Sequence, residues 1–539
     1  MKEISMKALI STYNKDGIME LAAFLHETGW EILSTDGTAR YLKEHNVPVT
    51  DVSQVTGFPE CLNGRVKTLH PAIHAALLAR RDDPAHIETL TKRGFSPIDL
   101  VCVNLYPFFE KIQDELSLDE TVEFIDIGGP ALVRSAAKNF KDVLALTDPA
   151  DYAEVIAGLK AGAVSFETRK RLAGKALALT SAYDAAISHF LLEEEYPLYY
   201  PISIKKAQHL RYGENSHQSA SLYFHTDKGG AIASMTQLHG KELSYNNIRD
   251  LDIAWKAACS FGLGREKPFY RDDMERLLPD TPRLPRVCCV AVKHNTPCGI
   301  SLGDTLAEAY EKTYICDPVS IFGGIVACNV NIDTETAKKL NELFLEIVVA
   351  PDFDEEALII LKQKKNIRIM KAPLAPRQKQ EYLSVDGGIL VQSTDQRLME
   401  TWNIVTKIKP EERDIRDMIF GMQAVAYVKS NAILIVKNLA AVGMSAGETN
   451  RIWAAEMALS RSVRVIETVY ARRQDCGDPA RVLVSDAYFP FPDVVEAAAA
   501  AGIKAIVQPG GSVKDALSIE AADNFGIAMV FTGTRHFKH

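Results

Sequence analysis

Short apolar runs alternate with stretches of helical period through roughly the first 200 residues, and this alternation constrains the fold most strongly. Strands that alternate with helices of about 10–15 residues predict an α/β domain with a parallel sheet and helices on both faces. Ligands bind such sheets beyond the carboxyl ends of the strands, and small polar residues occupy those positions here. The predicted strands are KALIST (7–12), WEILST (30–35), DLVCVNLY (99–106) and VLALTD (143–148), and the predicted helices include 17–29 and 37–46.

A change of composition divides the chain near residue 198. A long helical stretch over 166–192 is followed by EEEYPLYYPISIKK (193–206), which contains two prolines. We therefore expect one domain over 1–198 and a second over 199–539. The second block also mixes strands with helices, and several of its strands end in small polar residues, which suggests two related α/β subdomains.

The bulk properties exclude several functions. A net charge of −9 argues against a nucleic-acid binder but not against small anionic substrates, which a local cluster of cations can hold. Nine cysteines, scattered from Cys61 to Cys476 without a CxxC pair, predict reduced thiols in a reducing compartment. The amino terminus lacks a signal-peptide pattern, and no run approaches the ~18 apolar residues that cross a bilayer. We expect a cytoplasmic enzyme.

Two polar segments of the first block have the composition of anion sites. In GRVKTLHP (64–71), Arg65 and Lys67 alternate and so point the same way in an extended segment, with Thr68 beside them. STDGT (34–38) stands between a predicted strand and a helix, where unpaired amides favour a phosphate. Taken singly, each segment is also compatible with a solvated loop or an ordinary helix cap.

Two further segments place polar groups after apolar runs. NLYP (104–107) contains Tyr106, and DIGGPALVRSAAKN (126–139) contains Asp126 and Lys138. Taken singly, Tyr106 is as easily a rim aromatic and Lys138 a solvated helix position. Together with the two anion-site segments, these motifs resemble the IMP cyclohydrolase domain of the bifunctional purine biosynthesis enzymes, over nearly all of the first 195 residues.

This resemblance implies a methylglyoxal synthase-like fold and assigns roles to residues. It implies that Lys67, Tyr106, Asp126 and Lys138 carry out the cyclisation. The residues implied to bind the phosphate, the ribose or other parts of the substrate are Lys15, Ser34, Thr35, Thr38, Arg65, Thr68, Asn104 and Gly128.

The second block opens with LRYGENSHQ (210–218), which offers a cation, a phenol and an imidazole in Arg211, Tyr212 and His217. Further on, Lys293 and His294 adjoin at the end of an apolar strand in VKHNTPCG (292–299). A lone Lys-His pair is a weak signal. With DPVSIFGGIVA, YVKSNAILIVKN, SDAYFPFPD, QPGGSVKD and the terminal FTGTRHFKH, however, the block resembles the AICAR transformylase domain of the same family up to the last residue.

The second resemblance implies a duplicated cytidine deaminase-like fold and a homodimer with transformylase sites at the subunit interface. It assigns catalysis to Lys293, His294 and Asn431, with 10-formyltetrahydrofolate as a co-substrate and no tightly bound cofactor. The residues implied to hold the ribotide or the folate are Arg211, Tyr212, His217, Gly323, Tyr488, Asp493, Arg535, Phe537 and His539.

A zinc deaminase is the rival that this fold suggests. Such an enzyme needs an HxE motif and a PCxxC motif. The second block has no HxE, and Ser301 stands where the second cysteine of PCxxC would be, so we expect no metal site.

Two departures from the family pattern keep alternatives open. Asp36 replaces a glycine in the predicted phosphate loop, where a carboxylate is repelled unless it points away or meets a cation, and Tyr13 alters the first loop. The first alternative is therefore a transformylase with an inactive or merely nucleotide-binding N-terminal domain. The second is a ligand-sensing module. The joint presence of Lys67, Tyr106, Asp126 and Lys138 argues against it, because a sensor needs no proton-handling groups.

Overall fold

The computed structural model describes residues 5–114, 116–226, 229–264, 268, 271–281, 283–468 and 481–539. It contains two compact units, one of Met1–Ala207 with Tyr223–Gly229 and one of Gln208–Leu222 with Gly230–His539. The domain boundary expected at residue 198 stays a prediction. Eight of the nine cysteines are described and six of these are buried, whereas Cys476 lies outside the described residues.

The first unit is built on a five-stranded sheet in the order β3-β2-β1-β4-β5, and every strand pair in it is parallel. The predicted α/β class and parallel sheet are confirmed. The strands are β1 (Lys7–Thr12), β2 (Glu31–Ser34), β3 (Thr50–Asp51), β4 (Leu100–Asn104) and β5 (Leu144–Leu146).

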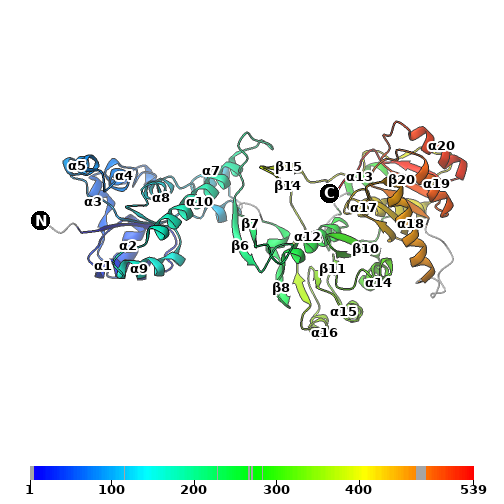
Figure 1. Cartoon of the computed structure of the whole chain (residues 1–539), viewed down its shortest axis with the longest axis horizontal. Coiled ribbons are helices and arrows are strands. Elements are labelled where there is room, and N and C mark those ends of the chain that lie inside the picture. Colours follow the sequence, from blue (N-terminus) through cyan, green and yellow to red (C-terminus); the bar gives the residue numbers. More distant parts are fainter. Residues whose placement is uncertain are drawn as a thin grey trace. The chain divides into compact units, whose positions relative to one another are not determined.

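Helices cover both faces of this sheet. Successive strand residues point to opposite sides, so the apolar residues of one strand pack against helices on both faces. Ala8 and Ile10 of β1 pack with α1, α2 and α9, whereas Leu9 packs with α4, α8 and α10 on the other face (Figure 1). The helices of this unit are α1 (Ile18–Glu27), α2 (Asp36–Glu44), α3 (Val52–Thr56), α4 (Pro71–Leu78), α5 (Pro84–Lys92), α6 (Phe108–Lys111), α7 (Leu118–Val122), α8 (Gly128–Lys138), α9 (Tyr152–Lys160) and α10 (Phe166–Leu191).

The second unit is built on a twelve-stranded mixed sheet in the order β16-β21-β20-β19-β17-β18-β10-β9-β11-β12-β13-β8. Outward from the central β18–β10 pair, both halves repeat one pattern of antiparallel and parallel neighbours. This repeat agrees with the two related subdomains expected from the sequence, while their likeness to cytidine deaminases stays a prediction. The strands of the first half are β8 (Thr236–His239), β9 (Val287–Lys293), β10 (Thr296–Gly303), β11 (Ile325–Cys328), β12 (Ile347–Ala350) and β13 (Arg368–Lys371).

The second half adds its own six strands and a matching set of helices. Helices α12 and α17 pack on one face of the large sheet, and α14–α16 and α18–α20 pack on the other. The strands are β16 (Asn403–Ile404), β17 (Ile433–Lys437), β18 (Ala440–Ser445), β19 (Val482–Ser485), β20 (Ala505–Gln508) and β21 (Ala528–Phe531). The helices of the unit are α11 (Ala231–Ser234), α12 (Tyr245–Ser260), α13 (Arg271–Leu277), α14 (Leu306–Cys316), α15 (Thr334–Asn341), α16 (Glu355–Leu361), α17 (Glu412–Val425), α18 (Arg451–Thr468), α19 (Asp493–Ala500) and α20 (Asp515–Phe525).

Two small sheets complete the described structure. One pairs β6 (Ile204–Leu210) with β7 (Ala220–His225), and the other is the hairpin of β14 (Gln380–Val385) and β15 (Gly388–Ser393). Among the described helices, none has the length and apolar content needed to cross a membrane.

Candidate functional sites

A cavity of about 740 Å³ opens at the carboxyl ends of β1, β2 and β4 in the first unit. Parallel strands end on one edge of a sheet, so segments far apart in sequence meet there. The predicted residues that line this cavity are Lys15, Thr35, Thr38, Arg65, Lys67, Thr68, Asn104, Tyr106, Asp126 and Gly128.

One wall of the cavity carries hydroxyls and an ammonium at the start of α2. Thr35 precedes the helix, and its Oγ1 lies 2.8 Å from Ser11 Oγ. Lys15 Nζ donates to Thr38 Oγ1 at 3.0 Å, and burial lowers the pKa of Lys15. Thr35 caps no amide of α2 with its side chain, so the helix presents amides, hydroxyls and an ammonium to an anion.

Lys67 lies between two carboxylates at the same cavity. Its Nζ is 3.1 Å from Asp36 Oδ2 and 3.2 Å from Glu60 Oε2. Burial lowers the pKa of Lys67, but the hydrogen bonds and charges of Asp36 and Glu60 raise it more, so the net shift is upward. Asp36 therefore meets a cation, as a carboxylate in a phosphate loop requires. Glu60 was not among the site residues predicted from the sequence.

Asp126 also lines the cavity, two residues before α8 begins. Its Oδ1 accepts the Gly129 amide at 2.8 Å, and Tyr183 Oη accepts the Asp126 amide at 2.9 Å. Burial raises the pKa of the Asp126 carboxyl, which suits a group that exchanges a proton. Glycine is needed at 129, because a Cβ there would lie 2.3 Å from Asp126 Oδ2.

Asn104 and Tyr106 follow β4. Asn104 Oδ1 accepts the amides of Tyr13 and Asn14 at 2.5 and 3.0 Å, which holds the first loop over the cavity. Tyr106 is exposed, and its ring contacts that of Tyr13 edge-on with centroids 5.8 Å apart. Tyr13 thus lines the site without displacing the predicted residues.

Two predicted residues lie away from the lining. Ser34 is fully buried and donates to the Ile10 carbonyl at 2.8 Å. Lys138 is exposed at the last residue of α8, about 15 Å along the helix from Gly128. Their roles stay predictions, as does that of Arg65, which is ion-paired with Glu123.

In the second unit, Lys293 and His294 lie in the KHNT turn (residues 293–296) between β9 and β10. Lys293 Nζ donates to the Phe322 carbonyl at 2.7 Å, next to Gly323, whose φ of 71° is left-handed. The pair therefore stands at a strand end, as expected, with Gly323 beside it.

The predicted ribotide residues of the first half lie on a loop before β7. Arg211 donates to Tyr212 Oη at 2.9 Å, and its guanidinium lies over the Tyr212 ring at 4.7 Å from the centroid. His217 is exposed on the same loop.

The remaining predicted residues gather in the second half. In the C-terminal tail (residues 535–539), the Arg535 guanidinium lies over the Phe537 ring at 4.6 Å, and the Phe537 and His539 rings are in edge contact. The Lys538 carbonyl accepts the Ser430 amide at 2.8 Å, which places the tail beside Asn431. Tyr488 is 42% exposed, and Asp493 begins α19.

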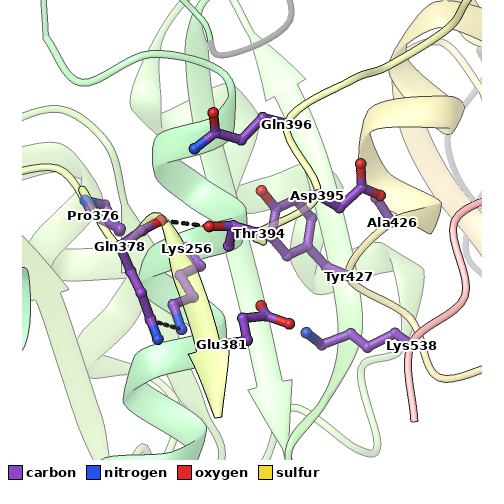
Figure 2. Close-up of a pocket in the computed structure, with 10 residues that line it drawn as sticks. All are labelled: Lys256, Pro376, Gln378, Glu381, Thr394, Asp395, Gln396, Ala426, Tyr427 and Lys538. Carbon is purple, nitrogen blue, oxygen red and sulfur yellow. Dashed lines mark hydrogen bonds between the residues drawn. The ribbon is translucent and has the colours of Figure 1, made fainter. Parts of the chain in front are cut away.

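Lys538 itself lines a cavity whose other lining residues are mostly polar. Figure 2 shows its amine facing Glu381, with Asp395 and Tyr427 nearby. Burial lowers the pKa of Lys538. His536 is buried and Lys538 is half-buried, whereas Arg535, Phe537 and His539 are exposed and so stay available to a ligand.

Direct interactions do not link the first-half and second-half residues of the predicted transformylase site in the described parts of the chain. Within the described parts of the chain, no hydrogen bond, ion pair or ring contact joins Arg211, Tyr212, Lys293 or His294 to Asn431 or the tail residues. Among all the residues that the structure describes, no group of three or more His, Cys, Asp or Glu side chains could hold a metal ion.

Comparison with known proteins finds relatives that match nearly the whole length of the chain. The model of the AICARFT/IMPCHase bienzyme family matches residues 136–461, and that of the MGS-like domain matches 17–131. The bifunctional purine biosynthesis protein PurH of Clostridium kluyveri is 52% identical over 534 residues, and its Clostridium botulinum counterpart is 53% identical over the same length, with 99% of each chain covered. The crystal structure of ForH has 37% identity and covers 34% of this chain and 96% of its own, with a TM-score of 0.32. The chain therefore belongs to the AICARFT/IMPCHase bienzyme family, the bifunctional purine biosynthesis proteins.

Proposed function

We propose that the chain transfers a formyl group from 10-formyltetrahydrofolate to 5-aminoimidazole-4-carboxamide ribotide and then closes the product to inosine monophosphate, the last two steps of de novo purine synthesis. Identity of 52–53% along 99% of the chain to proteins named for bifunctional purine biosynthesis carries this proposal. The cavity of the first unit supports retention of the second reaction, because it gathers ten of the twelve residues predicted for it.

Formyl transfer belongs to the second unit. The ribotide amine is a poor nucleophile because its lone pair is delocalised, so it must lose a proton as its bond to the formyl carbon forms. His294 takes that proton. Lys293 and Asn431 stabilise the oxyanion that develops on the formyl oxygen, and the bond from the formyl carbon to the folate nitrogen then breaks with protonation of that nitrogen.

Cyclisation belongs to the cavity of the first unit. The carboxamide nitrogen attacks the formyl carbon within one molecule, and water leaves, so the protein mainly holds a folded conformer and moves protons. Lys67 in its ammonium form polarises the formyl oxygen that departs as water. Asp126, whose pKa burial raises, exchanges a proton with the attacking nitrogen, and Tyr106 assists at the rim. Lys15, Thr35 and Thr38 hold the phosphate at the start of α2.

We propose further that the enzyme is a cytoplasmic homodimer that binds neither nucleic acid nor membrane. Among the described residues, no hydrogen bond, ion pair or ring contact joins Lys293 and His294 to Asn431 or the tail, and a site completed across two subunits would account for this. The eight described cysteines, six of them buried, fit a reducing compartment.

One pair of variants tests both reactions. With the formylated ribotide as the sole substrate, the wild type should form inosine monophosphate and Lys67→Ala should not. The ultraviolet absorbance of inosine monophosphate measures its formation. With the ribotide and the folate, Lys67→Ala should still consume the formyl donor, whereas His294→Ala should not. Binding of the formylated ribotide without turnover by the wild type would instead support a transformylase with a nucleotide-binding N-terminal domain.

A further inference from the structure

The two halves of the second unit each contain the same unusual turn. His294 and Asn295 join β9 to β10 with φ of 54° and 56°, and Asn438 and Leu439 join β17 to β18 with φ of 51° and 59°. The left-handed region is unfavourable for most residues with a Cβ, so contacts from outside the turn help to hold two such residues in a row. We call the turn between β17 and β18 the KNLA turn (residues 437–440).

In each half, a carboxylate on an earlier helix gives that support. Asp250 of α12 accepts the Asn295 amide on its Oδ1 at 2.5 Å, and it also interacts with the His294 amide. Asp417 of α17 accepts the Leu439 amide on Oδ1 at 2.7 Å and the Asn438 amide on Oδ2 at 3.0 Å. The two halves thus share one device, but only the KHNT turn carries a histidine.

The residue next to Asp250 on α12 contacts the loop that carries Arg211 and Tyr212. Arg249 Nη1 donates to Glu214 Oε1 at 2.7 Å, and Asn246 Nδ2 donates to the Glu214 carbonyl at 3.2 Å. The first turns of α12 therefore touch both functional segments of the first half.

We propose that Asp250 and Arg249 are positioning residues for formyl transfer: Asp250 fixes the KHNT turn, and Arg249 fixes the ribotide loop relative to it. The proposal rests on the proposed formyl transfer. If a reacting group is displaced, the rate of the chemical step falls because the reacting atoms no longer meet at attack distance. If a binding loop is displaced, substrate binding weakens. The two residues should therefore affect different kinetic constants.

The test compares Asp250→Ala, Asp250→Asn and Asp417→Ala in the full-length enzyme. Asp250→Ala should lower kcat for formyl transfer by about a hundredfold. Asp250→Asn, which keeps an oxygen to accept an amide, should recover part of that loss. Asp417→Ala removes the matching contact from the KNLA turn and should leave kcat within about twofold. Arg249→Met should raise KM for the ribotide by about tenfold with little change in kcat.

Hydrogen exchange of the backbone amides tests the same contacts without activity. Asp250→Ala should speed exchange over 293–296 and leave 437–440 unchanged, and Asp417→Ala should do the reverse. Cyclisation of the formylated ribotide should be unchanged in every variant, because that site lies in the other unit. Native kcat with unchanged exchange in Asp250→Ala, or an equal loss of kcat in Asp417→Ala, would overturn the proposal. Wild-type enzyme without formyl transfer would refute the proposed function, while the exchange data would still decide whether Asp250 holds the turn.

Discussion

Asp36 Oδ2 lies 3.1 Å from Lys67 Nζ, so the carboxylate that departs from the family pattern is ion-paired with a residue predicted to act in cyclisation. Glu60 approaches the same ammonium from another segment, at 3.2 Å. Although burial lowers the pKa of Lys67, the two carboxylates raise it overall. Asp36 thus keeps Lys67 charged and restrains its position, instead of merely repelling a phosphate.

Replacing Asp36 by asparagine should move the basic limb of the cyclisation pH profile to lower pH. Lys67 acts as an ammonium in the proposed reaction, and removal of one of the carboxylates that raise its pKa makes the ammonium lose its proton earlier. The measurement is kcat/KM for the formylated ribotide across the alkaline range. Asp148→Asn is the matched control, because Asp148 pairs with Lys175 at 2.7 Å away from the cavity. An identical basic limb in wild type and Asp36→Asn would show that Lys67 does not set that limb.

Removal of residues 535–539 should abolish formyl transfer and spare cyclisation. The deletion takes away the Arg535–Phe537–His539 group, whereas the cavity of the first unit is lined only by residues of that unit. Both reactions are measured on the same preparation, so retained cyclisation demonstrates that the enzyme is intact. Undiminished formyl transfer would mean that the tail has no part in the site.

A milder change should reveal how the tail is held. His536 is buried, with Nδ1 2.6 Å from Asp395 Oδ2 and Nε2 2.9 Å from the Leu398 carbonyl. His536→Ala removes both contacts but leaves the outward residues in the chain, so KM for the ribotide should rise by about tenfold while kcat changes less. Arg397→Ala, which removes a side chain that is 64% exposed near the same segment, is the control. A fall in kcat at constant KM would assign the tail to the chemical step instead.

Most of the fold was predictable because it follows from local patterns. The strand predicted over 7–12 is β1, and the helix predicted over 166–192 is α10 (Phe166–Leu191). The convergence of Lys15, Thr38 and Asp126 on one cavity also follows from the pattern, since parallel strands end on the same edge.

Contacts between irregular segments could not be predicted in this way. Glu60 lies in a loop without a period, and nothing in the sequence indicates that it meets Lys67 and Asp36. The contact of Asp250 with Asn295 spans 45 residues. It depends on two consecutive residues with a left-handed backbone, His294 and Asn295. Neither is a glycine, so the sequence does not indicate that conformation.

The stability of the second unit should depend on pH through Asp417. Burial raises the pKa of Asp417 to about 6, despite the two amides that favour its ionised form. A carboxyl with a raised pKa binds its proton more tightly in the folded state, so the free energy of unfolding falls as pH rises from about 4 to 6. Wild type should lose on the order of 2 kcal/mol over this window relative to Asp417→Asn, measured by urea unfolding at several pH values. Parallel pH dependences for the two proteins would contradict the raised pKa.

Replacing Gly129 by alanine should impair cyclisation by displacing Asp126. The added Cβ would lie 2.3 Å from Asp126 Oδ2 and 3.0 Å from Leu105 Cδ2, and the short carboxylate side chain cannot move away without giving up the Gly129 amide. We expect kcat for cyclisation to fall by about tenfold to a hundredfold, since a catalytic group displaced by about 1 Å loses most of its effect. Formyl transfer should be unchanged. Gly174→Ala is the control, because no atom lies within 4 Å of a Cβ at that position in α10 and alanine favours a helix. If Gly129→Ala cyclised at the native rate, the carboxylate of Asp126 could not be the group that exchanges the proton in this step.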